Sequence, residues 1–147
     1  MSRRMGLTLL GVALSCFVAF SATAHAFGKT TGTPKRSTLV LTASPLVAFA
    51  PSRIILTGRI EGGADDDEQL YCPAIEWDWG DGTTSENSAD CTPFQAGKTS
   101  IQRMFIKEHI YRSAGEFRVK LTLKRRDKAL TSASTLLELR SGMGDDR

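Results

Sequence analysis

The strongest constraint on the fold is the strict alternation of apolar and polar side chains from Glu116 to Lys124. Successive side chains of a strand point to opposite faces, so this pattern predicts a strand with one buried face. Such a strand must bury its apolar face against a second layer. The apolar positions of this segment are Phe117, Val119, Leu121 and Leu123.

Similar alternation recurs at short intervals along the chain, with little helical periodicity. Pro45 and Pro51 bracket residues 46–50, where we expect at most a short edge segment, because proline cannot donate to a ladder. The regular spacing predicts an all-β fold, an antiparallel sandwich of about seven short strands. The other strand segments are residues 37–44, 53–61, 74–79, 100–111 and 130–139.

Residues 1–26 have the three parts of a secretory signal peptide. A positive start with Arg3 and Arg4 precedes an apolar run over residues 6–20, and small residues follow up to Ala26. The apolar run is shorter than the roughly 20 residues that a membrane span needs. We therefore expect cleavage after Ala26, a secreted or periplasmic protein, and no membrane span after cleavage.

Two other export signals match less well. Residues 13–16 resemble a lipobox, but Ala13 stands where a larger aliphatic residue is usual; in this interpretation Cys16 carries a lipid anchor. The Arg3–Arg4 pair is similar to a twin-arginine signal, but Gly6 stands where that signal has a bulky apolar residue. We rank both below ordinary export, and a mature N-terminus at Phe27 would exclude the lipoprotein.

The charge of the chain argues against one class of partner. It has 19 Lys and Arg residues against 16 Asp and Glu residues, and cleavage of the leader removes two of the basic ones. Nucleic-acid-binding domains are usually far more basic, with the charge clustered. We therefore expect no nucleic-acid partner.

Two of the three cysteines, Cys72 and Cys91, lie in the mature part. In an oxidising compartment an even pair of cysteines predicts a disulfide. A zinc site is the alternative, but it needs more ligands, and His109 is the single histidine of the mature chain.

The segment Trp77-Asp78-Trp79-Gly80-Asp81-Gly82 joins two tryptophans and two aspartates to two turn-forming glycines. The tryptophans share an alternating face with Ile75, so we expect them in the core; the alternative is a pair of exposed rings that stack on sugars. We expect Asp78 and Asp81 to accept hydrogen bonds from turn amides; the alternative is ligation of a cation.

This segment and the following Thr83 resemble the hallmark of the PKD (polycystic kidney disease type) domain, in which Trp79 is usually Phe. The family also has a His-x-Tyr segment and a glycine before an alternating strand. Both occur here in the right order, and the resemblance covers about residues 39–139. The matching positions are His109, Tyr111 and Gly115.

The resemblance implies an immunoglobulin-like β-sandwich over residues 37–140, with a linker at 27–36 before it and a polar tail at 141–147 after it. It implies a structural role for the motif residues. It also implies a spacer or a binding module for protein or polysaccharide that is not itself an enzyme. The chain departs from the family in the Cys72/Cys91 pair, in a longer segment between Gly82 and His109, and in Lys107, where an apolar residue is common.

Four consecutive acidic residues lie in the loop over residues 62–69. Calcium prefers several oxygen ligands from a flexible loop, so this loop is the candidate calcium site. A solvated acidic tip is the alternative, because the spacing matches no known calcium motif. The candidate ligands are Asp65, Asp66, Asp67 and Glu68.

Taken together, the sequence predicts an exported, non-catalytic module for protein or polysaccharide binding or scaffolding in the cell envelope. Its binding surface would be the loops at one end of the sandwich or an exposed edge strand that adds a partner strand. The alternatives are a calcium-binding accessory domain and an enzyme that acts on glycans or peptides. Catalysis needs a nucleophile with a base, a metal set or paired acids in a cleft, and the sequence offers no such motif. We expect no cofactor other than calcium.

Overall fold

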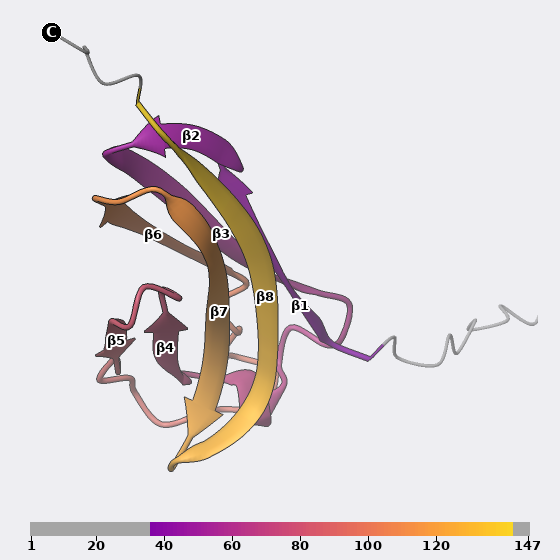
Figure 1. Ribbon diagram of the computed structural model, residues 1–147. Helices are drawn as coiled ribbons and strands as arrows, with labels where there is room; N and C mark the ends of the chain where they lie inside the picture. The colour runs from indigo at the N-terminus through magenta and orange to yellow at the C-terminus, as the bar shows by residue number, and fades with distance from the viewer. Residues whose placement is uncertain (1–35, 143–147) are drawn as a thin grey trace, which may run out of the picture. The chain divides into compact units, whose positions relative to one another are not determined.

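The computed structural model describes residues 36–142. Within this range the chain has eight strands and one short 3-10 helix, η1 (Glu68–Leu70), which follows β3 (Figure 1). The strands are β1 (Thr38–Ser44), β2 (Val47–Ala50), β3 (Ser52–Glu61), β4 (Ala74–Asp78), β5 (Thr84–Asn87), β6 (Met104–Tyr111), β7 (Gly115–Arg125) and β8 (Lys128–Ser141).

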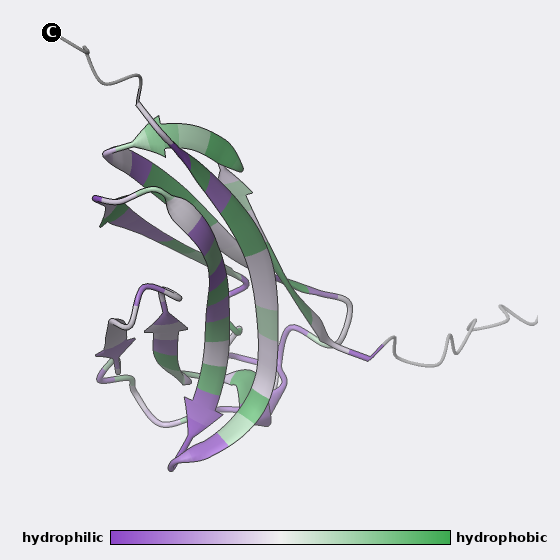
Figure 2. Cartoon of the chain, viewed as in Figure 1, coloured by the Kyte–Doolittle hydropathy of each residue, from purple (hydrophilic) through white to green (hydrophobic). Residues whose placement is uncertain are grey.

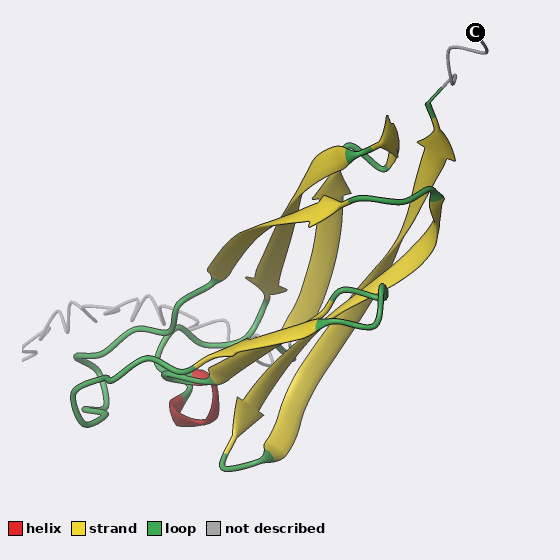
Figure 3. Cartoon of the chain, turned by 60° about the vertical axis from the view of Figure 1, so that its left-hand side comes forward, coloured by secondary structure: helices red, strands yellow, loops and turns green. Residues whose placement is uncertain are grey.

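The strands form two sheets that pack face to face (Figure 3). One sheet has three strands in the order β1-β3-β6, and the other has five in the order β2-β8-β7-β4-β5. Neighbouring strands are antiparallel in the first sheet and along β8-β7-β4-β5 in the second. The predicted all-β sandwich is confirmed, and β6 and β5 are the last strands of their sheets.

Two strands differ from the sequence prediction. Strand β2 pairs with β8 in parallel, so the chain changes sheets between β1 and β2. It is the expected short edge strand between Pro45 and Pro51. Strand β5 lies outside the strand segments that the sequence predicts, and it pairs with β4 through the register Asp78↔Thr84. With both included, the described part of the chain has eight strands rather than about seven.

The core lies between the two sheets and is built from the alternating positions. Along β7, hydrophobic and hydrophilic bands alternate (Figure 2), and Val119, Leu121 and Leu123 are fully buried. Their counterparts on β3 are Ile54 and Leu56, which are also fully buried. The remaining buried apolar residues are Leu39, Leu41, Ile60, Leu70, Trp77, Trp79, Ile101, Phe105, Tyr111, Leu137 and Leu139.

Several predictions fall outside the described residues. The signal peptide, the cleavage site at Ala26, the Cys16 lipobox and nearly all of the 27–36 linker belong to this group, as does the tail after residue 142. Strand β8 extends to Ser141, the first residue assigned to that tail. Over residues 36–142 the structure has no helix that is long and apolar enough to cross a membrane.

Candidate functional site

The tryptophan-aspartate segment forms the turn between β4 and β5. Asp78 Oδ1 accepts a hydrogen bond from the Gly80 N–H (3.0 Å), and Asp81 Oδ1 accepts one from the Thr83 N–H (3.0 Å). The Trp79 N–H donates to the Thr83 carbonyl (3.1 Å). Gly80 has φ +75°, and a Cβ there would lie 2.6 Å from the Arg118 carbonyl oxygen, so the turn requires glycine.

The aromatic rings of this turn pack into the core instead of facing solvent. Trp77 and Trp79 are 4% and 3% exposed, and their rings stack with centroids 5.4 Å apart. The Trp79 ring also stacks on the ring of His109 of β6, with centroids 4.4 Å apart, and His109 meets Tyr111 edge to face. Tyr111 donates a hydrogen bond from its hydroxyl to the Trp79 carbonyl (2.9 Å). This row of rings joins the two sheets, and it leaves neither tryptophan available to stack on a sugar.

Asp81 connects the turn to β6 through His109. Its Oδ2 lies 2.7 Å from His109 Nε2, and its Oδ1 also accepts from the Thr83 hydroxyl (2.6 Å). Burial alone raises the pKa of Asp81, but the hydrogen bonds from Thr83 and His109 outweigh it and lower this pKa below 3.8.

We expect the Asp81 carboxylate to make the stability of the fold depend on pH in the acid range. Because the pKa of Asp81 is lowered on folding, its contribution is complete above 3.8 and is lost as the pH falls through the folded-state pKa. Asp81→Asn should therefore unfold at a lower temperature than the wild type near neutral pH. The difference should narrow in acid, and a difference independent of pH would contradict the role given to Asp81.

The outer face of the three-stranded sheet carries four exposed apolar side chains, which we call the β6 face. Ile106 is 60% exposed and Ile110 50%, both on β6. In the β3–β6 register Ile106 lies opposite Thr57, and Ile55 lies opposite Glu108, between the two β6 isoleucines. Isolated exposed apolar residues are ordinary, but a contiguous group on one face marks an interaction surface. The β6 face consists of Ile55, Met104, Ile106 and Ile110.

A family model describes most of the chain. The PKD domain model matches residues 38–137. The chain belongs to the PKD domain family. Domains of this family are generally non-catalytic modules and are typically extracellular. A comparison with curated protein sequences found no match.

Solved structures with a similar fold include another PKD domain. It is similar to the PKD domain of an M14-like peptidase from a Thermoplasmatales archaeon, with 13% identity and a TM-score of 0.50, over 74% of this chain and 99% of that one. It is also similar to a CARDB domain from Pyrococcus furiosus, solved in complex with di-metal ions, with 10% identity and a TM-score of 0.44, over 77% of this chain and 100% of that one. The two packed sheets and the likeness to the PKD domain of the M14-like peptidase confirm the predicted immunoglobulin-like sandwich.

The acidic loop of the PKD domain spreads its carboxylates among separate partners. Asp65 pairs with Arg103 at 2.5 Å, Glu68 lies 3.5 Å from Arg125, and Asp67 accepts the Gln69 N–H at the start of η1. Within residues 36–142, no group of three or more His, Cys, Asp or Glu residues is arranged to hold a metal ion. Calcium binding by Asp65, Asp66, Asp67 and Glu68 stays a prediction, tested by the change in melting temperature on calcium addition.

Cys72 and Cys91 form a disulfide that ties the segment before β4 to the long loop after β5. On the same segments, the Tyr71 hydroxyl donates to the Thr92 carbonyl (3.0 Å), and its ring lies 5.5 Å from that of Phe94. The disulfide fits an oxidising compartment. These contacts fix a loop that has little regular secondary structure of its own.

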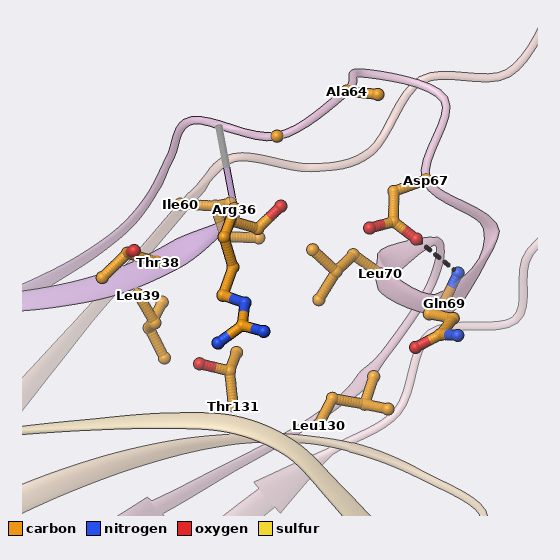
Figure 4. A pocket seen from close by; sticks show the side chains of 12 residues that line it. Arg36, Thr38, Leu39, Ile60, Ala64, Asp67, Gln69, Leu70, Leu130 and Thr131 are labelled. Carbon is orange, nitrogen blue, oxygen red and sulfur yellow. Dashed lines mark hydrogen bonds between the residues drawn. The ribbon is translucent and has the colours of Figure 1, made fainter. Parts of the chain in front are cut away.

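A cavity of about 720 Å³ lies at one end of the sandwich, where the chain enters β1 (Figure 4). The Arg36 side chain extends toward Thr131 with Leu39 on one side and Leu70 on the other, and Leu130 also lines the cavity (Figure 4). Its lining contains no aromatic ring on which a sugar would stack. The cavity lies away from the motif turn, and no residue of that turn lines it.

A second exposed apolar group lies around β2, on the outer face of the other sheet. Phe49 is 62% exposed and Leu136 of β8 is 50% exposed, with Leu46 and Val47 beside them. Pro45 and Pro51 flank this strand, which limits its use as an open edge.

The sequence pattern predicted neither the β6 face nor the exposed apolar group around β2. One signal for the β6 face was available. Residues 104–111 carry apolar side chains on both alternating faces, whereas a strand with one solvated face should carry them on one face only.

Proposed function

We propose that this PKD domain is an exported, non-catalytic module that binds a protein partner through the β6 face. The observation that carries the proposal is the coincidence of exposed Ile106 and Ile110 with the free edge of β6. Apolar side chains supply binding energy, and an unpaired strand edge supplies main-chain donors and acceptors. The predicted leader and the Cys72–Cys91 disulfide support export.

A protein partner suits this surface better than a polysaccharide. Sugar recognition depends on exposed aromatic faces, and the β6 face is wholly aliphatic apart from the thioether of Met104. The two tryptophans that suggested sugar stacking are 4% and 3% exposed. Aliphatic side chains beside charged ones, such as the Arg53–Glu108 ion pair (3.1 Å), are typical of a protein interface.

The test compares two lysine substitutions of equal charge on opposite sheets. Ile106→Lys alters the β6 face, and Leu136→Lys alters an aliphatic residue of similar exposure near β2. The tagged mature protein is recovered from the envelope fraction, and the proteins and polysaccharide that co-purify are quantified. We expect one protein to co-purify with the wild type and with Leu136→Lys, and to fall by at least about tenfold with Ile106→Lys, because a charge is then buried at the interface.

Other outcomes would contradict the proposal. Loss of the partner with Leu136→Lys alone would place the binding surface at β2. If both variants retain the co-purifying protein equally, the β6 face is not its binding surface. Recovery of polysaccharide without protein would favour a carbohydrate-binding module instead. Circular dichroism of both variants checks that they are folded.

A further inference from the structure

The backbone hydrogen bonds of β6 indicate how a partner could bind at the β6 face. The Ile60 N–H donates to the Arg103 carbonyl (2.9 Å), immediately before β6 begins. In an antiparallel ladder, hydrogen-bonded and non-hydrogen-bonded pairs alternate. The β6 residues that bond to β3 are therefore Phe105, Lys107 and His109, with Tyr111 at the end of the strand.

It follows that the main-chain groups of the intervening residues point away from β3. These residues are Met104, Ile106, Glu108 and Ile110, and β6 is the last strand of its sheet. The Gln102 side-chain amide donates to the Met104 carbonyl (2.8 Å), which closes that end of the edge. Ile106, Glu108 and Ile110 remain, and within the described chain no backbone bond beyond the strand ladders reaches them. A row of unpaired N–H and C=O groups of this kind is a template for another strand.

Lys107 sets the chemistry of the strand that fits. It lies opposite the buried Leu56 and so has the inward orientation of the strand, yet its side chain is exposed. With Phe105 it lines a groove of about 240 Å³ between β6 and β5. Among the described residues Lys107 has no ion-pair partner, whereas Glu86 across the groove lies 4.0 Å from Lys124. An acidic side chain facing Lys107 would gain a partner of opposite charge.

The same lysine disfavours a second copy of the chain. Two symmetric antiparallel registers would pair all three open residues, Ile106, Glu108 and Ile110, with residues of another β6. One is centred on Lys107 and places lysine opposite lysine; the other is centred on Glu108 and places glutamate opposite glutamate. Like charges directly opposite each other destabilise a strand pair, and an inward-pointing charge is a usual defence of edge strands against self-association.

We infer that β6 takes up an extended segment of another protein as an added strand, with an acidic residue of that segment facing Lys107. The residues on either side of the acidic one face outward and extend the apolar β6 face, so the segment alternates apolar and polar side chains. Main-chain hydrogen bonds to Ile106, Glu108 and Ile110 provide the register-independent part of the affinity, and the pair with Lys107 selects the register. This inference rests on the proposed function.

The experiment uses two end-blocked peptides of alternating Val and Thr that differ only in a central Glu or Lys. Binding to the ¹⁵N-labelled mature protein is followed by amide exchange and chemical shifts. We expect the Glu peptide to protect the amides of Ile106, Glu108 and Ile110 and to leave those of Phe105 and His109 unchanged. It should bind about fivefold more tightly than the Lys peptide, and Lys107→Glu should reverse the preference.

Backbone pairing is tested separately by N-methylation of the peptide. Only alternate peptide amides point at β6, so methylation of one alternate set should abolish binding and methylation of the other should not. Equal affinity of the two peptides, no reversal by Lys107→Glu, or shifts without protection of the three amides would overturn the inference. Protection of these amides in a dimer without peptide would make a second copy the occupant and equally overturn it.

Failure here is distinguishable from failure of the proposed function. If Ile106→Lys loses the co-purifying protein while the peptides protect none of the three amides, the β6 face binds a folded partner without strand addition. If Ile106→Lys keeps the partner, the proposed function itself fails.

Discussion

Replacing Trp79 by alanine is expected to lower the free energy of unfolding by about 3–5 kcal/mol, the cost usual for removing a large buried ring. Trp79 is 3% exposed, and its ring stacks on Trp77 and on His109, which belong to different sheets. Truncation leaves a cavity between the sheets and removes both stacks. Urea unfolding followed by circular dichroism measures the change.

The control is Trp79→Phe, which keeps an aromatic ring at this position. It should lose clearly less stability than Trp79→Ala, because the remaining ring fills part of the space and still stacks on His109. If the alanine variant does not fold, the phenylalanine variant still gives a measurable loss. A loss of less than about 1 kcal/mol in both variants would show that the ring is not a core element.

The second large effect is expected from removing the disulfide. Cys72 and Cys91 are 19 residues apart, and closing a loop of that length stabilises the folded state by about 3 kcal/mol in the chain-entropy model. The double variant Cys72→Ser/Cys91→Ser avoids leaving a free thiol. Guanidinium unfolding of the variant should show this loss.

The matched control is the wild-type protein unfolded under reducing conditions. Its midpoint should approach that of the double variant, since both lack the same cross-link. A wild type whose midpoint is insensitive to reductant, together with an unchanged double variant, would show that Tyr71, Thr92 and Phe94 hold the loop without the covalent bond.

The sequence predicts the features that neighbouring residues determine, and it does not predict which distant strands pair. The alternation of β7 and the glycines at Gly80 and Gly82 identify a strand and a turn from neighbouring residues alone. The pairing of β2 with β8 joins segments about 90 residues apart in sequence, and alternation carries no information on which strands pair. The polar residues of β5 have no strand pattern; the turn after Trp79 returns the chain beside β4 and so makes the pairing.

The candidate site, too, could be predicted only in part from the sequence. The aromatic and acidic residues that the sequence offers as binding candidates have partners within the fold. Trp79 packs in the core, Asp81 hydrogen-bonds to His109, and Asp65 forms an ion pair with Arg103. The exposed surface on β6 was visible only as a mixed pattern, with Met104 and Ile106 out of phase with Phe105 and Tyr111. The order of strands is needed to show that, within residues 36–142, no strand pairs with β6 on its outer side.

The most direct test of the account is site-specific photo-crosslinking in the intact envelope. A photoreactive side chain is placed at Ile106, and, as the matched position on the opposite sheet, at Leu136. If the β6 face binds protein, a discrete crosslink to one protein should form from Ile106 and none from Leu136. Crosslinks from Leu136 alone, or none from Ile106 under conditions in which the partner co-purifies, would contradict the claim that this PKD domain binds protein through the β6 face.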